Sequence, residues 1–97
     1  MKLRQTPLAS LADANPILHL DGPEKGWLSF DCPFHEGCTR IEVPTFLVGE
    51  AGGDRGWIRN GDDLAAMTLT PSLKRGGRCQ WHGFVKNGRF EHCGDSR

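Results

Sequence analysis

Residues 79–85, Cys-Gln-Trp-His-Gly-Phe-Val, decide the fold, because they predict a metal-binding turn that runs directly into a β-strand. A Cys and a His separated by two residues can hold one ion from a tight turn, whose backbone N–H groups also support the thiolate. Gly83 allows the backbone to come close to the sulfur. We therefore start from a metal site that includes Cys79 and His82.

Downstream of this turn the sequence predicts a β-hairpin. Asn87-Gly88 lies between two short apolar runs, and this pair favours a type I′ turn because both of its residues tolerate positive φ. A two-residue turn also sets the register: Lys86 opposite Arg89, Val85 opposite Phe90, Gly83 opposite His92, and His82 opposite Cys93. Directly opposite side chains lie about 5 Å apart, so the hairpin carries Cys93 to the metal turn.

A second half-site lies upstream, in Cys32-Pro33-Phe34-His35-Glu36-Gly37-Cys38. Two such turns separated by a strand-rich segment are typical of zinc ribbons, and a structural Zn²⁺ takes four ligands in a tetrahedron. The predicted ligands of a single structural Zn²⁺ are Cys32, Cys38, Cys79 and His82, with Cys93 and His35 as alternates. His92 has the opposite strand parity to Cys93, so it is expected to point away from the ion.

The composition predicts a thin core. The chain has 97 residues, of which 37% are hydrophobic and 13 are glycine, so it forms one domain with little apolar surface to bury. Small domains of this kind are often held together by a metal or by disulfides. The predicted fold is a small β-rich, mainly antiparallel, zinc-ribbon-like domain with a C-terminal β-hairpin and little helix. A weakly ordered arm is expected at residues 1–25 and the zinc-binding β domain at residues 26–97.

The cysteines bear on the cellular compartment. The start of the sequence lacks the apolar run of a secretory signal, and no stretch approaches the roughly 20 apolar residues of a membrane span. We therefore expect a soluble cytoplasmic protein. Thiols stay reduced in that compartment, so four cysteines accompanied by histidines indicate a metal rather than disulfides.

Other motifs give weaker evidence of function. His35-Glu36 lacks the second histidine of H-E-x-x-H, and the H-x-E and P-C-x-x-C motifs of zinc deaminases are missing as well. Thr68-Leu69-Thr70-Pro71-Ser72 offers three hydroxyl groups beside a proline, and we expect an ordinary strand end there. Trp27, Trp57 and Trp81 are expected to fill the core, although Trp81 could instead be exposed on the metal turn.

Several motifs in order resemble a family of small phage- and prophage-encoded proteins of unknown function. They are Phe30-Asp31-Cys32-Pro33, Trp57 to Asp62, Thr68 to Leu73, and Cys79 to Gly88. The resemblance covers about 70% of the chain, from Trp27 onward. It implies a zinc-binding, β-rich domain, and it implies no activity.

The expected function is a structural-zinc accessory or binding module, encoded by a phage or mobile element, that acts on a protein partner. The formal net charge of zero and the lack of an evident catalytic residue set favour this hypothesis over an enzyme. One alternative is a nucleic-acid-binding zinc ribbon, whose basic and aromatic surface would consist of Lys74, Arg75, Arg78, Trp81, Lys86 and Arg89. A second alternative is a metalloenzyme with an open zinc position. No membrane partner is expected, and the sequence does not predict an oligomeric state.

Overall fold

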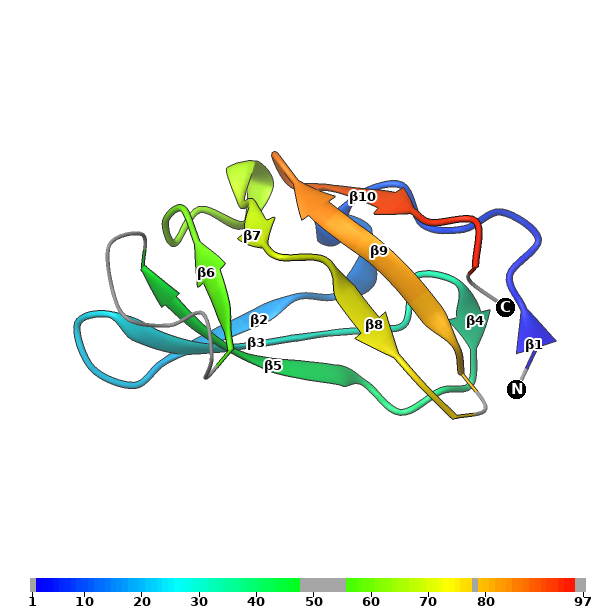
Figure 1. Ribbon diagram of the computed structural model, residues 1–97, viewed down its shortest axis with the longest axis horizontal. Helices are drawn as coiled ribbons and strands as arrows, with labels where there is room; N and C mark the ends of the chain where they lie inside the picture. Colours follow the sequence, from blue (N-terminus) through cyan, green and yellow to red (C-terminus); the bar gives the residue numbers. More distant parts are fainter. Residues whose placement is uncertain (1, 48–55, 78, 96–97) are drawn as a thin grey trace.

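The computed structural model describes residues 2–47, 56–77 and 79–95. In this part of the chain ten strands form three sheets, and the two helical segments are short 3-10 turns. A long β-sheet runs along the molecule and a shorter one crosses it (Figure 1). The prediction of a small, β-rich, mainly antiparallel domain with little helix is confirmed. A zinc-ribbon topology finds no support in this arrangement.

The largest sheet has five strands in the order β2-β3-β5-β6-β7. All of its neighbouring strands are antiparallel except the pair β5 and β6. Its strands are β2 (Ile17–Leu20), β3 (Lys25–Phe30), β5 (Ile41–Leu47), β6 (Trp57–Arg59) and β7 (Leu69–Thr70). Strand β6 pairs with β5 only over Thr45–Leu47, so no described strand pairs with the first half of β5 on that side.

The second sheet has three strands in the order β10-β9-β8. They are β8 (Leu73–Arg75), β9 (Trp81–Lys86) and β10 (Arg89–His92). Strands β9 and β10 form the predicted hairpin, with Lys86 opposite Arg89, Val85 opposite Phe90, and Gly83 opposite His92. Asn87 and Gly88 both have positive φ, as a type I′ turn requires.

Side-chain alternation along the strands builds the core between these two sheets. Buried residues at every second position come from β3, β5 and β9, as in Leu28 and Phe30, Ile41 and Val43, and Trp81 and Val85. Trp81 is 1% exposed and its ring lies against those of Phe30 and Phe90, at centroid distances of 6.3 and 5.7 Å. Trp81 is therefore a core residue, whereas Trp27 is exposed on the outer side of its sheet.

The N-terminal residues pack on the rest of the molecule. Strand β1 (Lys2–Leu3) pairs with β4 (His35–Glu36), and the segment η1 (Leu11–Ala14) buries Leu11 and Ala14. The Phe90 N–H donates to the Ala9 carbonyl at 2.9 Å, so residues 9–11 lie along the outer edge of β10. Residues 2–25, which fall within the region where a weakly ordered arm was expected, thus contribute strands and core side chains. The other helical turn is η2 (Leu64–Ala66).

Candidate active site and metal centre

Ser72 lies where the chain passes from one sheet to the other. It follows β7 of the five-stranded sheet and immediately precedes β8 of the three-stranded sheet. The indole N–H of Trp57 donates to the Ser72 carbonyl oxygen at 3.1 Å, which holds the backbone at this corner. The Ser72 residue is half-buried, and its side chain projects from the outer face of the sheet.

The register of β8 and β9 brings His82 to this serine. Lys74 pairs with His82 across the two strands, so their side chains share one face of the sheet. Ser72 lies two residues before Lys74 and projects from the same face. The His82 Nε2 atom is 3.1 Å from the Ser72 Oγ atom, within hydrogen-bond distance.

Asp95 reaches His82 from the turn that follows β10. The Cys93 N–H donates to the His82 carbonyl at 2.8 Å, which extends the hairpin pairing to these two residues. Asp95 follows Cys93 by two residues, and its Oδ1 and Oδ2 atoms lie 2.9 and 3.2 Å from the His82 Nδ1 atom. The hydrogen bond with His82 lowers the pKa of Asp95 below its ordinary value, and the positive charge of Lys74 acts in the same direction.

These contacts fix the protonation pattern that a nucleophilic serine needs. The ionised Asp95 carboxylate accepts hydrogen bonds and cannot donate them, so Nδ1 of a neutral His82 carries the proton. Nε2 is then unprotonated and accepts the hydrogen bond from the Ser72 hydroxyl. A serine, a histidine base and an orienting carboxylate in this order form the Ser-His-Asp triad, which is recognised by geometry rather than by the order of residues in the sequence.

A comparison with protein-family models gives a result that agrees with this geometry. Residues 4–93 match the model described as the bacterial ubiquitination-like system serine protease, BubE. The chain belongs to the BubE family. The match includes Ser72 and His82, and Asp95 follows two residues beyond it. No curated protein and no solved structure matches the chain.

Membership of the BubE family overturns the expected function. A structural-zinc accessory module that acts through protein contacts was wrong, because the family is described as a serine protease. The resemblance to phage proteins of unknown function is confirmed only in part: the chain belongs to a family from a bacterial system. A phage origin finds no support.

The nucleic-acid surface expected from the sequence is not assembled as predicted. Trp81 is buried and cannot stack on a base. Arg75 donates to the carbonyl and hydroxyl of Thr39, and Lys86 forms an ion pair with Glu91 at 3.3 Å. Arg78 lies outside the described residues, and the remaining basic residues, Lys74 and Arg89, are exposed.

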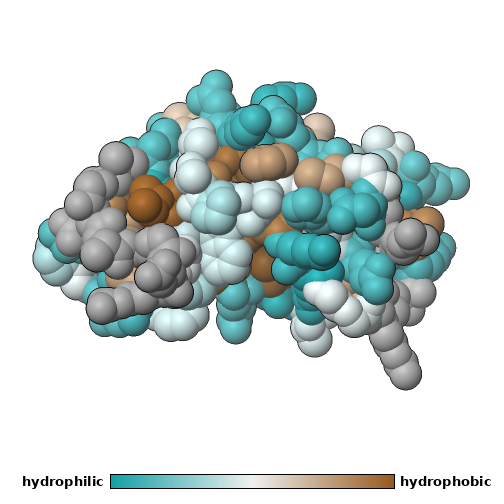
Figure 2. All heavy atoms as spheres, viewed as in Figure 1, coloured by the Kyte–Doolittle hydropathy of each residue, from teal (hydrophilic) through white to brown (hydrophobic). Residues whose placement is uncertain are grey.

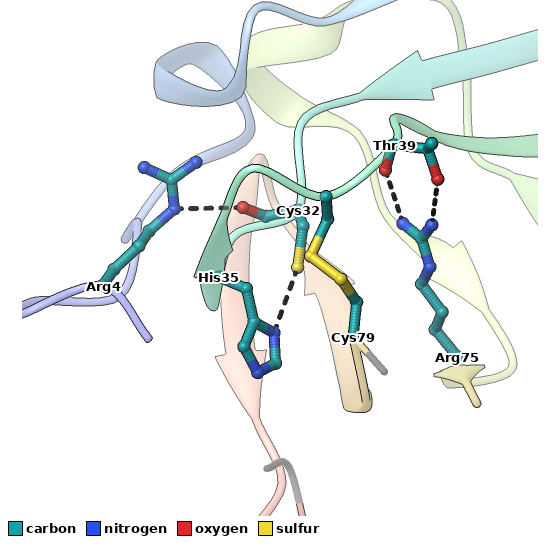
Figure 3. Close-up of a disulfide and its surroundings, with 7 residues drawn as sticks. Arg4, Cys32, His35, Thr39, Arg75 and Cys79 are labelled. Atoms are coloured by element: carbon teal, nitrogen blue, oxygen red, sulfur yellow. Dashed lines mark hydrogen bonds between the residues drawn. A yellow bond between two sulfur atoms is a disulfide. The ribbon is translucent and has the colours of Figure 1, made fainter. Parts of the chain in front are cut away.

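The two cysteine-bearing turns do converge, in a group of side chains that could hold a metal. Ligand atoms of Cys32, His35 and Cys38 all lie within 4.8 Å of one another, and Cys79 joins the group through its disulfide with Cys38. The expectation of a metal rather than disulfides was wrong for this pair, because the fold brings the two turns close enough for their sulfurs to bond. Figure 3 shows the His35 ring directed toward the Cys32 sulfur beside this disulfide, at a distance of 3.6 Å from Nδ1. The Arg4 Nε atom donates to the Cys32 carbonyl at 3.0 Å.

The predicted ligands therefore separate into two groups. Cys32, Cys38, Cys79 and the alternate ligand His35 lie together in what we call the cysteine cluster. His82 lies in a second group, with Cys93 and Asp95. The separation follows from the fold, because His82 projects from the outer face of β9 toward Ser72. His92 lies on the opposite face, where its Nδ1 atom accepts a hydrogen bond from Trp81.

Two of the three triad residues were not predicted from the sequence. Ser72 was assigned to an ordinary strand end, and Asp95 was not considered. One available signal was the hairpin register, which already placed Cys93 opposite His82 and hence Asp95 on the same face. The contact between β8 and β9 could not be derived in this way, because Gly76-Gly77 and the residues around them give no defined turn length.

Proposed function

We propose that this chain is a serine peptidase of a bacterial ubiquitination-like system, with Ser72 as nucleophile, His82 as general base and Asp95 as the group that orients His82. The observation that carries the proposal is the continuous line of contacts from Ser72 Oγ to His82 Nε2, at 3.1 Å, and from His82 Nδ1 to Asp95 Oδ1, at 2.9 Å. The description of the family as a serine protease supports the same chemistry.

The residues would act in two steps. As Ser72 Oγ attacks the carbonyl carbon of the substrate, His82 Nε2 takes the hydroxyl proton, and Asp95 stabilises the resulting imidazolium. His82 then gives this proton to the leaving nitrogen, so the amine departs and an acyl ester remains on Ser72. Water attacks the ester with the same histidine as base, which releases the acid and restores the serine.

The substrate class follows from the kind of system that the family serves. Ubiquitination-type conjugation joins a carboxyl group to an amine, and the product is an amide that a Ser-His-Asp triad can hydrolyse. His82 and Asp95 have side chains that are 26% and 51% exposed, so the triad lies at the surface, where a folded conjugate can reach it. The expected protein partner would then be the conjugate itself.

The test uses a small alkyl fluorophosphonate, which reacts with activated serines. We expect one adduct per chain, located on Ser72 by peptide mass spectrometry, and loss of labelling in Ser72→Ala and His82→Gln. Ser10→Ala is the matched control, because the Ser10 hydroxyl lies near Asp13 in an exposed turn. Labelling that persists in Ser72→Ala, or wild-type protein that does not react at all, would exclude the triad as a catalytic unit.

We also propose that the cysteine cluster binds one Zn²⁺ when its thiols are reduced. Cys32, His35, Cys38 and Cys79 supply three sulfurs and one nitrogen, which is a usual donor set for tetrahedral zinc. Two-electron reduction of the Cys38–Cys79 disulfide by an external thiol, which is itself oxidised to a disulfide, would give the two thiolates that bind the ion. Reduced thiols suit a cytoplasmic location, which we propose on the same ground.

The ion would stabilise the position of His82 indirectly, through the backbone that links Cys79 to His82. Cys79 lies three residues before His82, and the cysteine cluster joins it to the turn that contains Cys32 and Cys38. Zinc would therefore fix the start of β9, and with it the position from which His82 reaches Ser72. The metal would have no direct part in the reaction.

A further inference from the structure

Strand β8 presents an unpaired backbone edge next to Ser72. Because His82 accepts a hydrogen bond from Cys93 of the hairpin, its backbone groups point to the β10 side, and those of Trp81 and Gly83 point to β8. Their partners Arg75 and Leu73 therefore form the ladder with β9. The N–H and C=O of Lys74 lie on the opposite edge, where β8 has no neighbouring strand in the described part of the molecule.

Strand β5 has a similar free edge. The Asp21 N–H donates to the Lys25 carbonyl, which sets the alternation in β3 so that Leu28 and Phe30 form the ladder with β5. Their partners on β5 are Val43 and Ile41, so the N–H and C=O of Glu42 point to the other side. Strand β6 reaches only as far as Thr45 on that side, which leaves the Glu42 groups uncovered by any described strand.

A groove of about 390 Å³ lies between these two edges. Its walls are residues 40–43, at and just before the start of β5, and residues 73–75 of β8. Trp57 and Trp81 also belong to its lining. In Figure 2, which has the view of Figure 1, brown apolar side chains lie among teal ones in the middle of this face. The volume falls within the roughly 300–1,000 Å³ that is usual for ligand sites.

Side chains join the two walls at both ends of the groove. At one end Arg75 of β8 donates to Thr39, just before β5, as Figure 3 shows. At the other end Trp57 of β6 donates to the Ser72 carbonyl. Strands β5 and β8 are linked by side chains and form no backbone ladder with each other. The distance between them is therefore wider than the 4.7–4.9 Å of paired strands.

We propose that this groove binds the acyl side of the substrate as an extended strand, which pairs with the Lys74 edge and the Glu42 edge and delivers its terminal carbonyl to Ser72. The inference rests on the proposed function. Addition of a peptide strand to an exposed sheet edge is an established mode of recognition, in which backbone hydrogen bonds give affinity and alternate side chains give specificity. Substrate side chains that face inward would lie against the half-buried Trp57, which favours apolar residues there.

The position of His82 indicates why the groove takes the acyl side. His82 must protonate the leaving nitrogen, so the leaving group has to lie near its Nε2 atom on the outer face of β8 and β9. A second hollow of about 330 Å³, lined in part by Lys74, His82 and Asp95, lies there and shares some of its lining with the groove. The groove toward β5 therefore remains for the acyl side of the substrate, which lies on the other side of the scissile bond.

The experiment compares two classes of Ser72-directed reagent on the full chain. One is the small alkyl fluorophosphonate, and the other is a pool of tripeptidyl diphenyl phosphonates with randomised side chains. For each variant, the rate of labelling by the peptidyl pool is divided by its rate with the small reagent, because Lys74 also lies beside His82 and Asp95. We expect this ratio to be about threefold to tenfold lower in Lys74→Pro than in Lys74→Ala, because one backbone donor is lost. Lys74→Ala is the matched control, since it removes the side chain and keeps the N–H.

Glu42→Pro and Glu42→Ala form a second matched pair on the other wall, where Pro44 already occupies the same edge. A proline at either position takes no donor from an existing ladder. A third measurement uses the wild-type chain alone: N-methylation of the backbone amides of the peptidyl phosphonates should slow their reaction with Ser72. Equal ratios of peptidyl to small-reagent labelling in the Pro and Ala variants, or no effect of N-methylation, would overturn the inference. Failure of the small reagent to label Ser72 would instead overturn the proposed function.

Discussion

The Ser72 Oγ and His82 Nε2 atoms lie 3.1 Å apart, although these residues are ten positions apart in the sequence, Ser72 just before β8 and His82 within β9. The contact depends on the antiparallel pairing of β8 with β9, which places Lys74 opposite His82 and Ser72 one strand repeat further along. A change of register by one residue would move Ser72 to the other face of the sheet. Formation of the triad and correct pairing of this sheet are therefore the same event.

Asp95→Asn should abolish most of the activity without unfolding the protein. An asparagine amide can donate to His82 Nδ1, and this favours the tautomer with the proton on Nε2, which cannot accept the proton of Ser72. Loss of the correct tautomer costs about 10⁴-fold in kcat in a serine protease triad. The rate of Ser72 labelling measures the effect, with Asp13→Asn as a control on another exposed aspartate. A loss below tenfold would mean that Asp95 does not orient His82.

The titration of Asp95 should shift when its partner is removed. Its pKa lies below 3.8 in the folded chain, mainly because of the hydrogen bond with His82. Ionised Asp95 therefore contributes stability above pH 3.8, and that contribution is lost as the pH falls through the lower, folded pKa.

Carboxyl NMR titration of Asp95 should show a midpoint that rises in His82→Gln. It should rise less in Lys74→Met, because the lysine charge is the smaller influence. A midpoint at or above 3.8 in the wild-type chain would contradict the hydrogen-bonded geometry.

Reduced protein should bind one Zn²⁺ or Co²⁺ through the cysteine cluster. Cys32→Ser and His35→Ala each remove one donor and should weaken binding, and Cys93→Ser is the matched control because Cys93 lies in the other group. Cobalt absorption reports thiolate ligation, and elemental analysis gives the stoichiometry. Chelation of the ion should lower the unfolding temperature, since binding free energy contributes to folding. Loss of the ion in Cys93→Ser with retention in Cys32→Ser would refute this assignment.

Gly83→Ala should destabilise the chain and disturb the triad. A Cβ atom at residue 83 would lie 2.6 Å from the Glu91 carbonyl oxygen and 2.6 Å from the Trp81 ring. The backbone oxygen cannot move without a change in β10, so we expect a loss of about 1–3 kcal/mol in the free energy of unfolding. Gly94→Ala is the control, because no atom lies within 4 Å of its added Cβ. Equal unfolding temperatures for the two variants would show that β9 and β10 adjust freely.

The hairpin was predictable because its register depends on local chemistry. Asn87 and Gly88 tolerate positive φ, and the two-residue turn then determines every pair in β9 and β10. The convergence of Cys32, Cys38 and Cys79 could also be anticipated, because cysteines in turns bounded by glycine and proline commonly meet in a metal site or a disulfide.

The triad was not predictable in the same way. Ser72 belongs to a corner between two sheets, and the pairing of β8 with β9 depends on tertiary packing that no short motif encodes. His82 was misleading because a Cys and a His separated by two residues also suit a metal site. Strand alternation resolves the ambiguity, since it directs His82 outward toward Ser72 while the core side chains point inward.

All three triad residues lie between positions 72 and 95, whereas the cysteine cluster unites residue 79 with residues 32–38. A gene fragment coding for residues 72–97 would thus carry the whole triad but none of the upstream cysteines that hold the start of β9. Transplantation of this fragment into another β scaffold would have to supply a substitute for that anchor, and the choice of recipient would decide whether the transferred chemistry survives.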